Sequence, residues 1–367
     1  MKQYAHVSLA TPPLVLCTSW ATVLWLAVTP LAAQPSHSFA DDLLRETMSL
    51  SASDLRSFDT GAAVIKRLDT PVNEELAYVG AVFVDAPSEQ FIERFRDIVE
   101  FESGPGIPQI ARFGSPPRIE DLAPLRLPPE DIEKLQKCRP GDCDLKLSAA
   151  AMTRFRDEVD WSSPDAAGHA EDVAREMILD IVLDYQENGN EALGYYDDGD
   201  DRMLIADEFR SILANGDPLP VPVPELQAHL EAYPRGDIDG AEDFFYWTVV
   251  DFGLKRTIRV NHVTIYRLDT NPPSRVRYAI AIKQLYASHY FHTTLELRFL
   301  VDDDRREGRR GASLISITRS RTDGMTGFKG LFVRPIVRRR SRAAVLSYLN
   351  QVKRQVERPL PEAIAIR

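Results

Sequence analysis

Two long stretches of alternating apolar and polar residues lie within the segment Val276–Val301, separated by a short break at Ala287-Ser288. Successive side chains of a β-strand point to opposite faces of a sheet, so a period of two predicts two strands here. The residues on one face are Val276, Tyr278, Ile280, Ile282 and Tyr286 in the first stretch, and Phe291, Thr293, Leu295, Leu297, Phe299 and Val301 in the second. The pattern therefore predicts an antiparallel pair with one face more deeply buried than the other.

Other segments repeat one of two periods. Segments with a period of two or rich in β-branched and aromatic residues predict strands at Ala62–Leu68, Glu75–Asp85, Gln109–Phe113, Ile258–Leu268 and Ser313–Arg321. A helical period predicts helices at Ser38–Phe58, Glu89–Phe101, Ala241–Phe252 and Ser341–Glu357, and several shorter helices between residues 119 and 233. Ser88 is expected to cap the second of these helices. Gly324–Gly330 predicts a loop before the last one.

Together these elements predict the α+β class. We expect a curved antiparallel sheet that grips a long C-terminal helix, with a mostly helical insertion at about residues 115–255 between the first helix and the main strands. The expected organisation is a signal peptide at residues 1–33, an N-terminal helix at 34–60 and one α+β domain at 61–367.

The N-terminal segment has the pattern of an export signal. Lys2 is its only charged residue before Asp41, the stretch Leu14–Ala33 is almost continuously apolar, and small residues precede Gln34. This pattern predicts cleavage after Ala33 and a periplasmic or secreted protein. The alternative is an uncleaved N-terminal membrane anchor, because about 20 apolar residues can span a bilayer.

Two of the three cysteines, Cys138 and Cys143, lie in the segment CRPGDC. The turn dipeptide Pro140-Gly141 brings the two thiols together, and an oxidising compartment favours a disulfide between them. The alternatives are a redox pair or a metal site. The C-x-x-C redox spacing is absent and further metal ligands are not nearby in the sequence.

The formal net charge of −11 argues against general nucleic-acid binding, which needs a basic surface. Positive charge is nevertheless concentrated near the C-terminus, where basic and apolar residues interleave. We expect Phe332, Arg338, Arg339 and Arg340 to face an anionic membrane surface. The alternative is that these arginines only make the start of the last helix soluble. Cations at that position oppose the helix dipole, so helix stability does not explain them.

One junction resembles a known family. After a predicted strand comes Val84-Asp85-Ala86-Pro87-Ser88-Glu89, followed by Phe91 and Asp97. This segment, together with the predicted C-terminal helix, resembles the START-like superfamily, also called the SRPBCC or helix-grip fold, over roughly residues 75–101 and 260–357. The chain departs from that pattern in the 150 or so residues between these two parts.

The resemblance implies that the protein binds or transports a lipid or another hydrophobic small molecule in the bacterial cell envelope. Such a ligand would occupy an apolar cavity between the sheet and the last helix. The candidate ligand-binding residues are Tyr266, Tyr278, Ile280, Ile282, His289, Phe291, Leu295 and Arg319. His289 and Arg319 are the polar members that would orient the ligand.

Motifs of catalysis are not evident. The chain lacks the G-x-S-x-G, P-loop and Rossmann glycine patterns. His289 and His292 form H-x-x-H, but on a strand they point to opposite sides, so we predict no metal site, no cofactor and no catalytic residue. Two other functions stay open, since fold alone does not fix function. One is a cyclase or hydrolase of START-like type, and the other is a structural or interaction module with a filled core.

Overall fold

The chain divides into two compact units, Met1–Ser36 and His37–Arg367. The computed structural model describes parts of the second: residues 43–45, 48–214, 223–236, 238–251, 253, 255–268, 275–303, 311–323 and 327–358. In the last helix, side chains are described from Arg334 onward. The predicted signal peptide at residues 1–33 lies outside the described residues.

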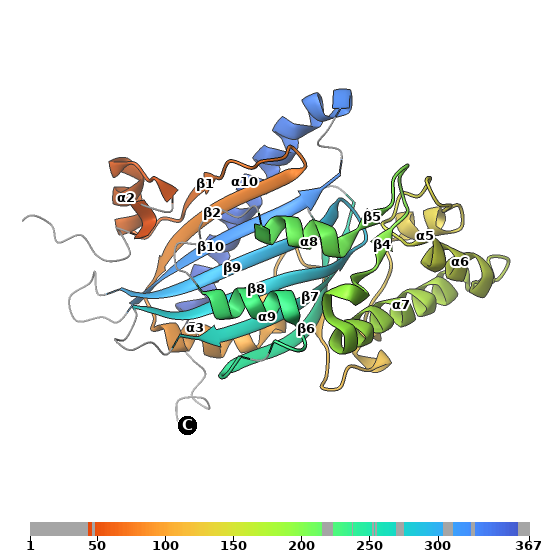
Figure 1. The fold of residues 1–367 in the computed structure, drawn as a ribbon, viewed down its shortest axis with the longest axis horizontal. Helices are drawn as coiled ribbons and strands as arrows, with labels where there is room; N and C mark the ends of the chain where they lie inside the picture. Colours follow the sequence, from red (N-terminus) through yellow and green to blue (C-terminus); the bar gives the residue numbers. More distant parts are fainter. Residues whose placement is uncertain are drawn as a thin grey trace, which may run out of the picture. The chain divides into compact units, whose positions relative to one another are not determined.

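An antiparallel sheet of eight strands organises the described part of the chain, in the order β1-β2-β10-β9-β8-β7-β6-β3 (Figure 1). The strands are β1 (Val64–Arg67), β2 (Glu75–Val84), β3 (Gln109–Arg112), β6 (Ala241–Val250), β7 (Thr257–Arg267), β8 (Val276–Ala287), β9 (Phe291–Asp303) and β10 (Gly311–Thr322). The predicted pair within Val276–Val301 is confirmed as β8 and β9, and the predicted hairpin as β1 and β2. The first strands of the chain therefore join the last ones, because β2 pairs with β10.

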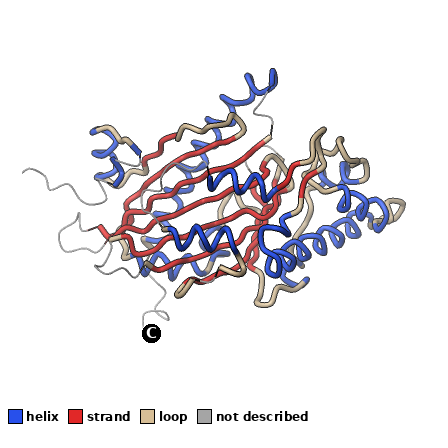
Figure 2. The backbone as a smooth tube through the Cα atoms, viewed as in Figure 1, coloured by secondary structure: helices blue, strands red, loops and turns tan. Residues whose placement is uncertain are grey.

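Helices cover both faces of this sheet (Figure 2). One face packs on α3 (Ser88–Arg96), α4 (Ile98–Glu102) and the C-terminal half of α10 (Gly327–Val356). The opposite face packs on α2 (Ala52–Asp59), α8 (Ile205–Ala214) and α9 (Pro224–Ala232). Both sets of contacts are made by buried apolar side chains, so most strands are buried on both sides. The α+β class with a large antiparallel sheet and a C-terminal helix is thus confirmed.

The segment between β3 and β6 is mainly helical. Its helices before Ile205 pack with the ends of β6, β7 and β8 in a third apolar cluster. They are η1 (Ile119–Leu122), α5 (Pro129–Leu135), α6 (Ala149–Glu158), α7 (Ala166–Asn188) and η2 (Gly189–Leu193), followed by α8 and α9, and a small pair of strands, β4 (Tyr195–Tyr196) and β5 (Met203–Leu204), lies among them. Gly189 ends α7 with a φ of 64°, as the sequence predicts for that glycine.

The predicted helix at Ala241–Phe252 is wrong, because this segment forms strand β6 between β7 and β3. Its residues Phe244-Phe245-Tyr246-Trp247 favour a strand by their shape, and all four are buried. Since helices cover both faces of the sheet, apolar residues stand at consecutive positions and the period of two is lost. A short continuous apolar run of this kind does not distinguish a strand from a buried helix.

Three predicted helix boundaries also need correction. The last helix includes Gly327 and does not begin at Ser341, although Pro335 lies inside it. The first predicted helix is interrupted at Ser49, where φ is 45°, and Ser51 caps α2. The predicted helix at Glu89–Phe101 is divided at Asp97, whose side chain accepts a hydrogen bond from the Glu100 backbone N–H and so caps α4.

Ser88 does not cap α3 as expected. It is the first residue of that helix, which begins after Pro87, and its hydroxyl donates to Asp302 Oδ1 at 2.9 Å. Among the described helices, none combines the length and the apolar character needed to cross a bilayer.

Candidate functional site

The N-terminal half of α10 carries a concentrated positive surface. Arg334, Arg338, Arg339, Arg340 and Arg342, called here the basic face, lie within nine residues, and all of α10 contains no Asp or Glu. Arg339, Arg340 and Arg342 are exposed. Ile336, beside them, is 57% exposed, which makes it one of the few large apolar side chains in contact with solvent among the described residues. The basic face thus combines cations with an accessible apolar group.

The opposite side of this half-helix is fixed to the sheet. Val337 packs against Leu76 and Tyr78 of β2, and the Tyr78 hydroxyl donates to the Arg338 carbonyl at 2.9 Å. Burial raises the pKa of Tyr78, which keeps its hydroxyl protonated as this donor. Arg340 also donates to the Gly253 carbonyl at 2.9 Å. These contacts fix this half-helix against the sheet, with Arg339 and Arg342 exposed.

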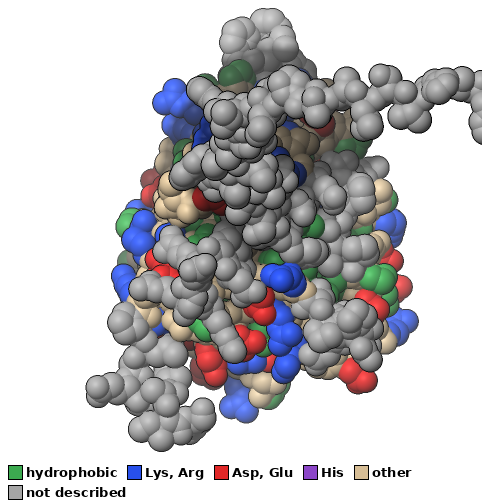
Figure 3. Space-filling model, turned by 90° about the vertical axis from the view of Figure 1, so that its left-hand side faces the viewer, with side chains coloured by type: hydrophobic (Ala, Val, Ile, Leu, Met, Phe, Trp, Pro, Cys, Tyr) green, Lys and Arg blue, Asp and Glu red, His purple; other side chains and the backbone are tan. Residues whose placement is uncertain are grey.

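Elsewhere the charges are mixed. In the lower half of the face drawn in Figure 3, Lys and Arg side chains lie next to Asp and Glu side chains. The structure describes the backbone of Phe332 in α10, while its side chain lies outside the described residues. Of the four residues predicted to face a membrane, Arg339 and Arg340 are exposed and Arg338 is partly buried.

The eight predicted ligand-binding residues do not meet at one place. Tyr278, Ile280 and Ile282 are buried toward α3, α4 and α10. Leu295 and Tyr266 belong to the cluster on the opposite face of the sheet. Each of the two polar residues has a carboxylate neighbour: His289 Nε2 lies 2.9 Å from Asp131 Oδ1, and Arg319 Nε donates to Glu75 Oε1 at 2.7 Å.

Phe291, the eighth residue, is half-buried at the start of β9. The described residues between the sheet and α10 pack closely. At Gly80 of β2 an added Cβ would lie 2.6 Å from a methyl carbon of Leu349, so the helix touches the strand directly.

Farther along the same face a buried ionic group fills the interior. Arg298 donates to Glu296 at 2.7 Å and to Glu102 at 3.4 Å, and the Tyr348 hydroxyl of α10 donates to Glu102 at 2.7 Å. Burial raises the pKa of Glu102, although Arg298 opposes this effect. The predicted location of the cavity is therefore occupied here by side chains that bond to one another.

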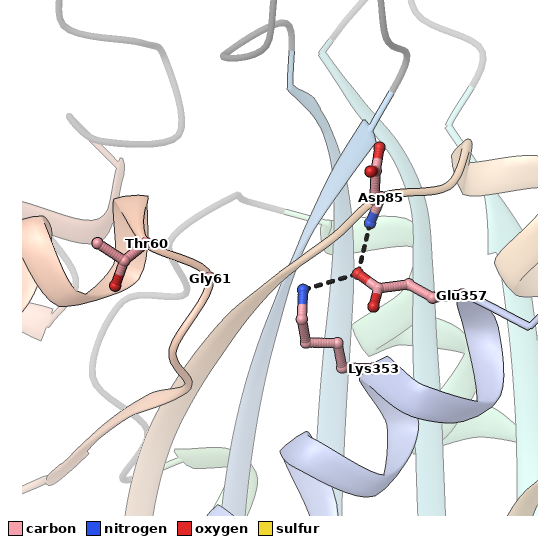
Figure 4. Close-up of a pocket in the computed structure, with 5 residues that line it drawn as sticks. All are labelled: Thr60, Gly61, Asp85, Lys353 and Glu357. Carbon is pink, nitrogen blue, oxygen red and sulfur yellow. Dashed lines mark hydrogen bonds and ion pairs between the residues drawn. The ribbon is translucent and has the colours of Figure 1, made fainter.

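One pocket of about 310 Å³ lies where β2 ends and α10 approaches its last turn (Figure 4). Thr60, Gly61, Asp85, Lys353 and Glu357 line it. Glu357 Oε1 accepts from the Asp85 backbone N–H at 2.9 Å and from Lys353 at 2.7 Å. These polar, mutually bonded groups do not resemble the mostly apolar lining of a site for a hydrophobic ligand.

A second group of polar residues lies on the α8–α9 face of the sheet, with two buried histidines and an aspartate that reaches solvent. Asp243 of β6, His262 of β7 and His229 of α9, called here the histidine–aspartate cluster, converge on one carboxylate oxygen. Asp243 Oδ1 lies 3.2 Å from His229 Nε2 and 2.8 Å from His262 Nε2, and it accepts from the Thr264 hydroxyl at 2.6 Å. Burial opposes ionisation of Asp243, but the hydrogen bonds with both histidines outweigh it and lower the pKa.

The sequence prediction missed this cluster. Assigned to a helix, Asp243 had no defined relation to His262, and His229 lay on another element. The useful signal is the strand register, in which Asp243 pairs with Thr264 and Phe245 with His262. In that register Asp243 and His262 are diagonal neighbours on adjacent strands, and their side chains lie on the same face of the sheet.

A third group surrounds His292 of β9. Its Nδ1 lies 3.4 Å from Glu208 Oε2, and its Nε2 contacts Asp323. Arg321 Nε donates to Glu208 at 2.7 Å, and Lys146 pairs with Asp323 at 2.5 Å. Burial raises the pKa of Glu208, but the bonds from His292 and Arg321 prevail and lower the pKa to about 2. His289 lies in the bend before β9 and not on a strand, so the predicted alternation does not apply to it, and the two histidines have separate partners.

The predicted disulfide between Cys138 and Cys143 is present. It is consistent with an oxidising, exported environment. No protein-family model matches the chain, and no curated protein is significantly similar to it. The resemblance to the START-like superfamily therefore stays a prediction.

Proposed function

We propose that this protein is exported to the bacterial cell envelope and binds the anionic surface of a membrane through the basic face of α10. The observation that carries the proposal is a 30-residue helix without any acidic residue in a chain whose formal net charge is −11. Each Lys or Arg near an anionic bilayer contributes about 1 kcal/mol of binding free energy. The exposed side chain of Ile336 supplies the apolar contact that interfacial helices add to charge.

Helix stability alone does not account for the arginines. They lie beyond the first turn of α10, which begins at Gly327, so the helix dipole does not favour cations at these positions. Arg339 and Arg342 are exposed, so the free energy of folding gains little from them. An external anionic partner gives these side chains a role that the fold does not supply.

Transport of a hydrophobic molecule is the second candidate from the START-like resemblance. The contacts described between the sheet and α10 favour it less, because Leu349, Val352 and Val356 are fully buried there and the Arg298 group is bonded internally. Membrane binding and internal carriage predict different outcomes in the same two assays, which are vesicle sedimentation and mass spectrometry of extracted lipids.

The proposal is tested by co-sedimenting the purified protein with phosphatidylcholine vesicles that contain or lack phosphatidylglycerol. We expect binding only to the anionic vesicles. The variant Arg339→Gln/Arg340→Gln/Arg342→Gln should bind about 100-fold more weakly, since three contributions of about 1 kcal/mol are lost. Binding should also decrease between 0.1 M and 1 M salt, because the Debye length shortens from about 10 Å to about 3 Å.

A matched control removes the same charge elsewhere. Lys137→Gln/Arg156→Gln/Arg210→Gln replaces three exposed cations on other helices or turns and should bind like the wild type. Equal binding to neutral and anionic vesicles, or equal loss in the two triple variants, would refute the proposal. A stoichiometric apolar molecule extracted from wild type and variant alike would instead support internal carriage.

A further inference from the structure

We propose that the histidine–aspartate cluster binds one divalent transition-metal ion, with Zn²⁺ as the best chemical match. The cluster brings together three ligand types that zinc accepts: two imidazole nitrogens and one carboxylate oxygen. One ligand atom from each of the three residues lies within 4.8 Å of the others. They come from α9, β6 and β7, so the fold assembles the group from separate parts of the chain.

The contacts of His229 favour a positive charge between its Nε2 and Asp243. Its Nδ1 contacts the Gly236 carbonyl oxygen, which only accepts hydrogen bonds, so Nδ1 carries the hydrogen. A neutral imidazole has one N–H, and its Nε2 then presents a lone pair to the Asp243 carboxylate 3.2 Å away. Two facing acceptors repel each other. The arrangement is stable with a cation between them, either a second proton or a metal ion.

His229 has the surroundings of a metal ligand, and the ring of His262 is held in place by its neighbours. A ligating histidine donates its other ring N–H to a carbonyl, a carboxylate or water, and His229 makes this contact with Gly236. His262 Nδ1 lies 3.3 Å from the Tyr185 hydroxyl, and the His262 ring stacks on Phe245 with centroids 4.7 Å apart. These contacts fix both rings with Nε2 directed at Asp243.

The spacing also suits a metal ion. Ligand atoms placed tetrahedrally about 2.0–2.1 Å from Zn²⁺ lie roughly 3.3 Å from one another. The two nitrogen-to-oxygen distances, 3.2 and 2.8 Å, are close to that value, so small side-chain rotations would open the position. The Asp243 side chain is 26% exposed, which gives an ion and a water molecule a route to the cluster. Three protein ligands would leave the fourth position to that water.

The group around His292 shows what distinguishes the cluster. It also contains a buried histidine and two carboxylates, Glu208 and Asp323. There, however, Arg321 and Lys146 compensate both carboxylates, and only one imidazole is present. His292 is therefore the matched control: it is a buried histidine that contacts carboxylates but lacks the second imidazole that a metal site would use. Imidazole ligands also disfavour Mg²⁺ and Ca²⁺, which prefer oxygen.

The test is titration of the protein, first freed of metal by dialysis against a chelator, with Zn²⁺, Co²⁺ and Mg²⁺ by calorimetry. We expect one Zn²⁺ per chain, a visible absorption band of Co²⁺ in a tetrahedral site, and no binding of Mg²⁺. His262→Gln, His229→Gln and Asp243→Asn should each weaken Zn²⁺ binding at least 100-fold and remove the increase in melting temperature that Zn²⁺ causes. His292→Gln should keep both responses.

Circular dichroism establishes that each variant is folded. If His262→Gln fails to fold, Zn²⁺ binding by the wild type and by Asp243→Asn still tests the proposal, because Asp243 is partly exposed and its replacement disturbs the core less. A wild-type chain that binds no Zn²⁺ at micromolar concentration overturns the proposal and leaves a hydrogen-bonded group of structural function. Equal weakening by His292→Gln and Asp243→Asn would also overturn it.

Discussion

At the scale of single residues, several buried or half-buried carboxylates in the described part of the chain have basic neighbours. Glu208 illustrates this most clearly, because His292 and Arg321 both bond to its carboxylate. Removing one partner of a buried group leaves the other desolvated and uncompensated, which costs more than the pair itself contributes. Stability should therefore depend on Glu208 more strongly than on the exposed acids near it.

Glu208→Gln should lower the free energy of unfolding by about 3 kcal/mol at pH 7. The pKa of Glu208 falls to about 2 in the folded protein, below its ordinary value of 4.5. Because this pKa is depressed, the stabilisation is fully present above about pH 4.5 and is lost as the pH falls toward 2. Urea denaturation of wild type and variant at several pH values measures the difference.

The neighbouring Asp207→Asn is the control, since Asp207 is exposed and pairs only across the helix surface with Arg210. Its effect at pH 7 should stay below about 1 kcal/mol. A Glu208→Gln penalty that does not shrink between pH 5 and pH 2.5 would contradict the ionic explanation.

At the scale of elements, the contact of α10 with β2 depends on a residue without a side chain. Gly80 allows Leu349 to approach the strand, and a Cβ at this position would lie 2.6 Å from the leucine methyl carbon. Gly80→Ala should therefore destabilise the protein by about 1–3 kcal/mol through overpacking. In the Leu349→Ala background the same change should cost much less.

A double-mutant cycle with urea denaturation measures this coupling. A coupling energy near zero would show that α10 does not press on β2 at Gly80. Gly104→Ala is a useful second comparison, because the Cβ there would meet the flexible side chain of Gln351.

The sequence predicts some of these elements and misses others for physical reasons. β8 and β9 are long, and their apolar and polar residues alternate clearly enough to predict both strands. β6 shows no such alternation at Phe244–Trp247, since both of its sides are buried. Pro335 and the nearby glycines indicate a break, yet α10 continues through them.

The two candidate sites differ in the same way. The basic face is contiguous in the sequence, so counting charges is enough to find it. The histidine–aspartate cluster depends on the pairing of β6 with β7 and on the packing of α9 above them. Those are properties of the folded chain that the spacing of residues 229, 243 and 262 does not reveal.

At the scale of the whole molecule, the disulfide links the fold to its compartment. Cys138 and Cys143 follow α5, and the turn between them is already closed by backbone hydrogen bonds between Arg139 and Asp142. Gly141 adopts a φ of 82° there, and its N–H donates to the Asp197 carbonyl at 2.7 Å. The disulfide thus closes a short loop that contacts the acidic turn beginning at Asp197, before β5.

A crosslink that closes so short a loop stabilises near the lower end of the usual range. Cys138→Ser/Cys143→Ser should therefore reduce the free energy of unfolding by about 2 kcal/mol and the melting temperature by a few degrees. A reductant should lower the melting temperature of the wild type to that of the variant and leave the variant unchanged. Protein made in a reducing cytoplasm should match the variant until it is oxidised. A reductant effect of equal size in both proteins would show that this disulfide does not stabilise the fold.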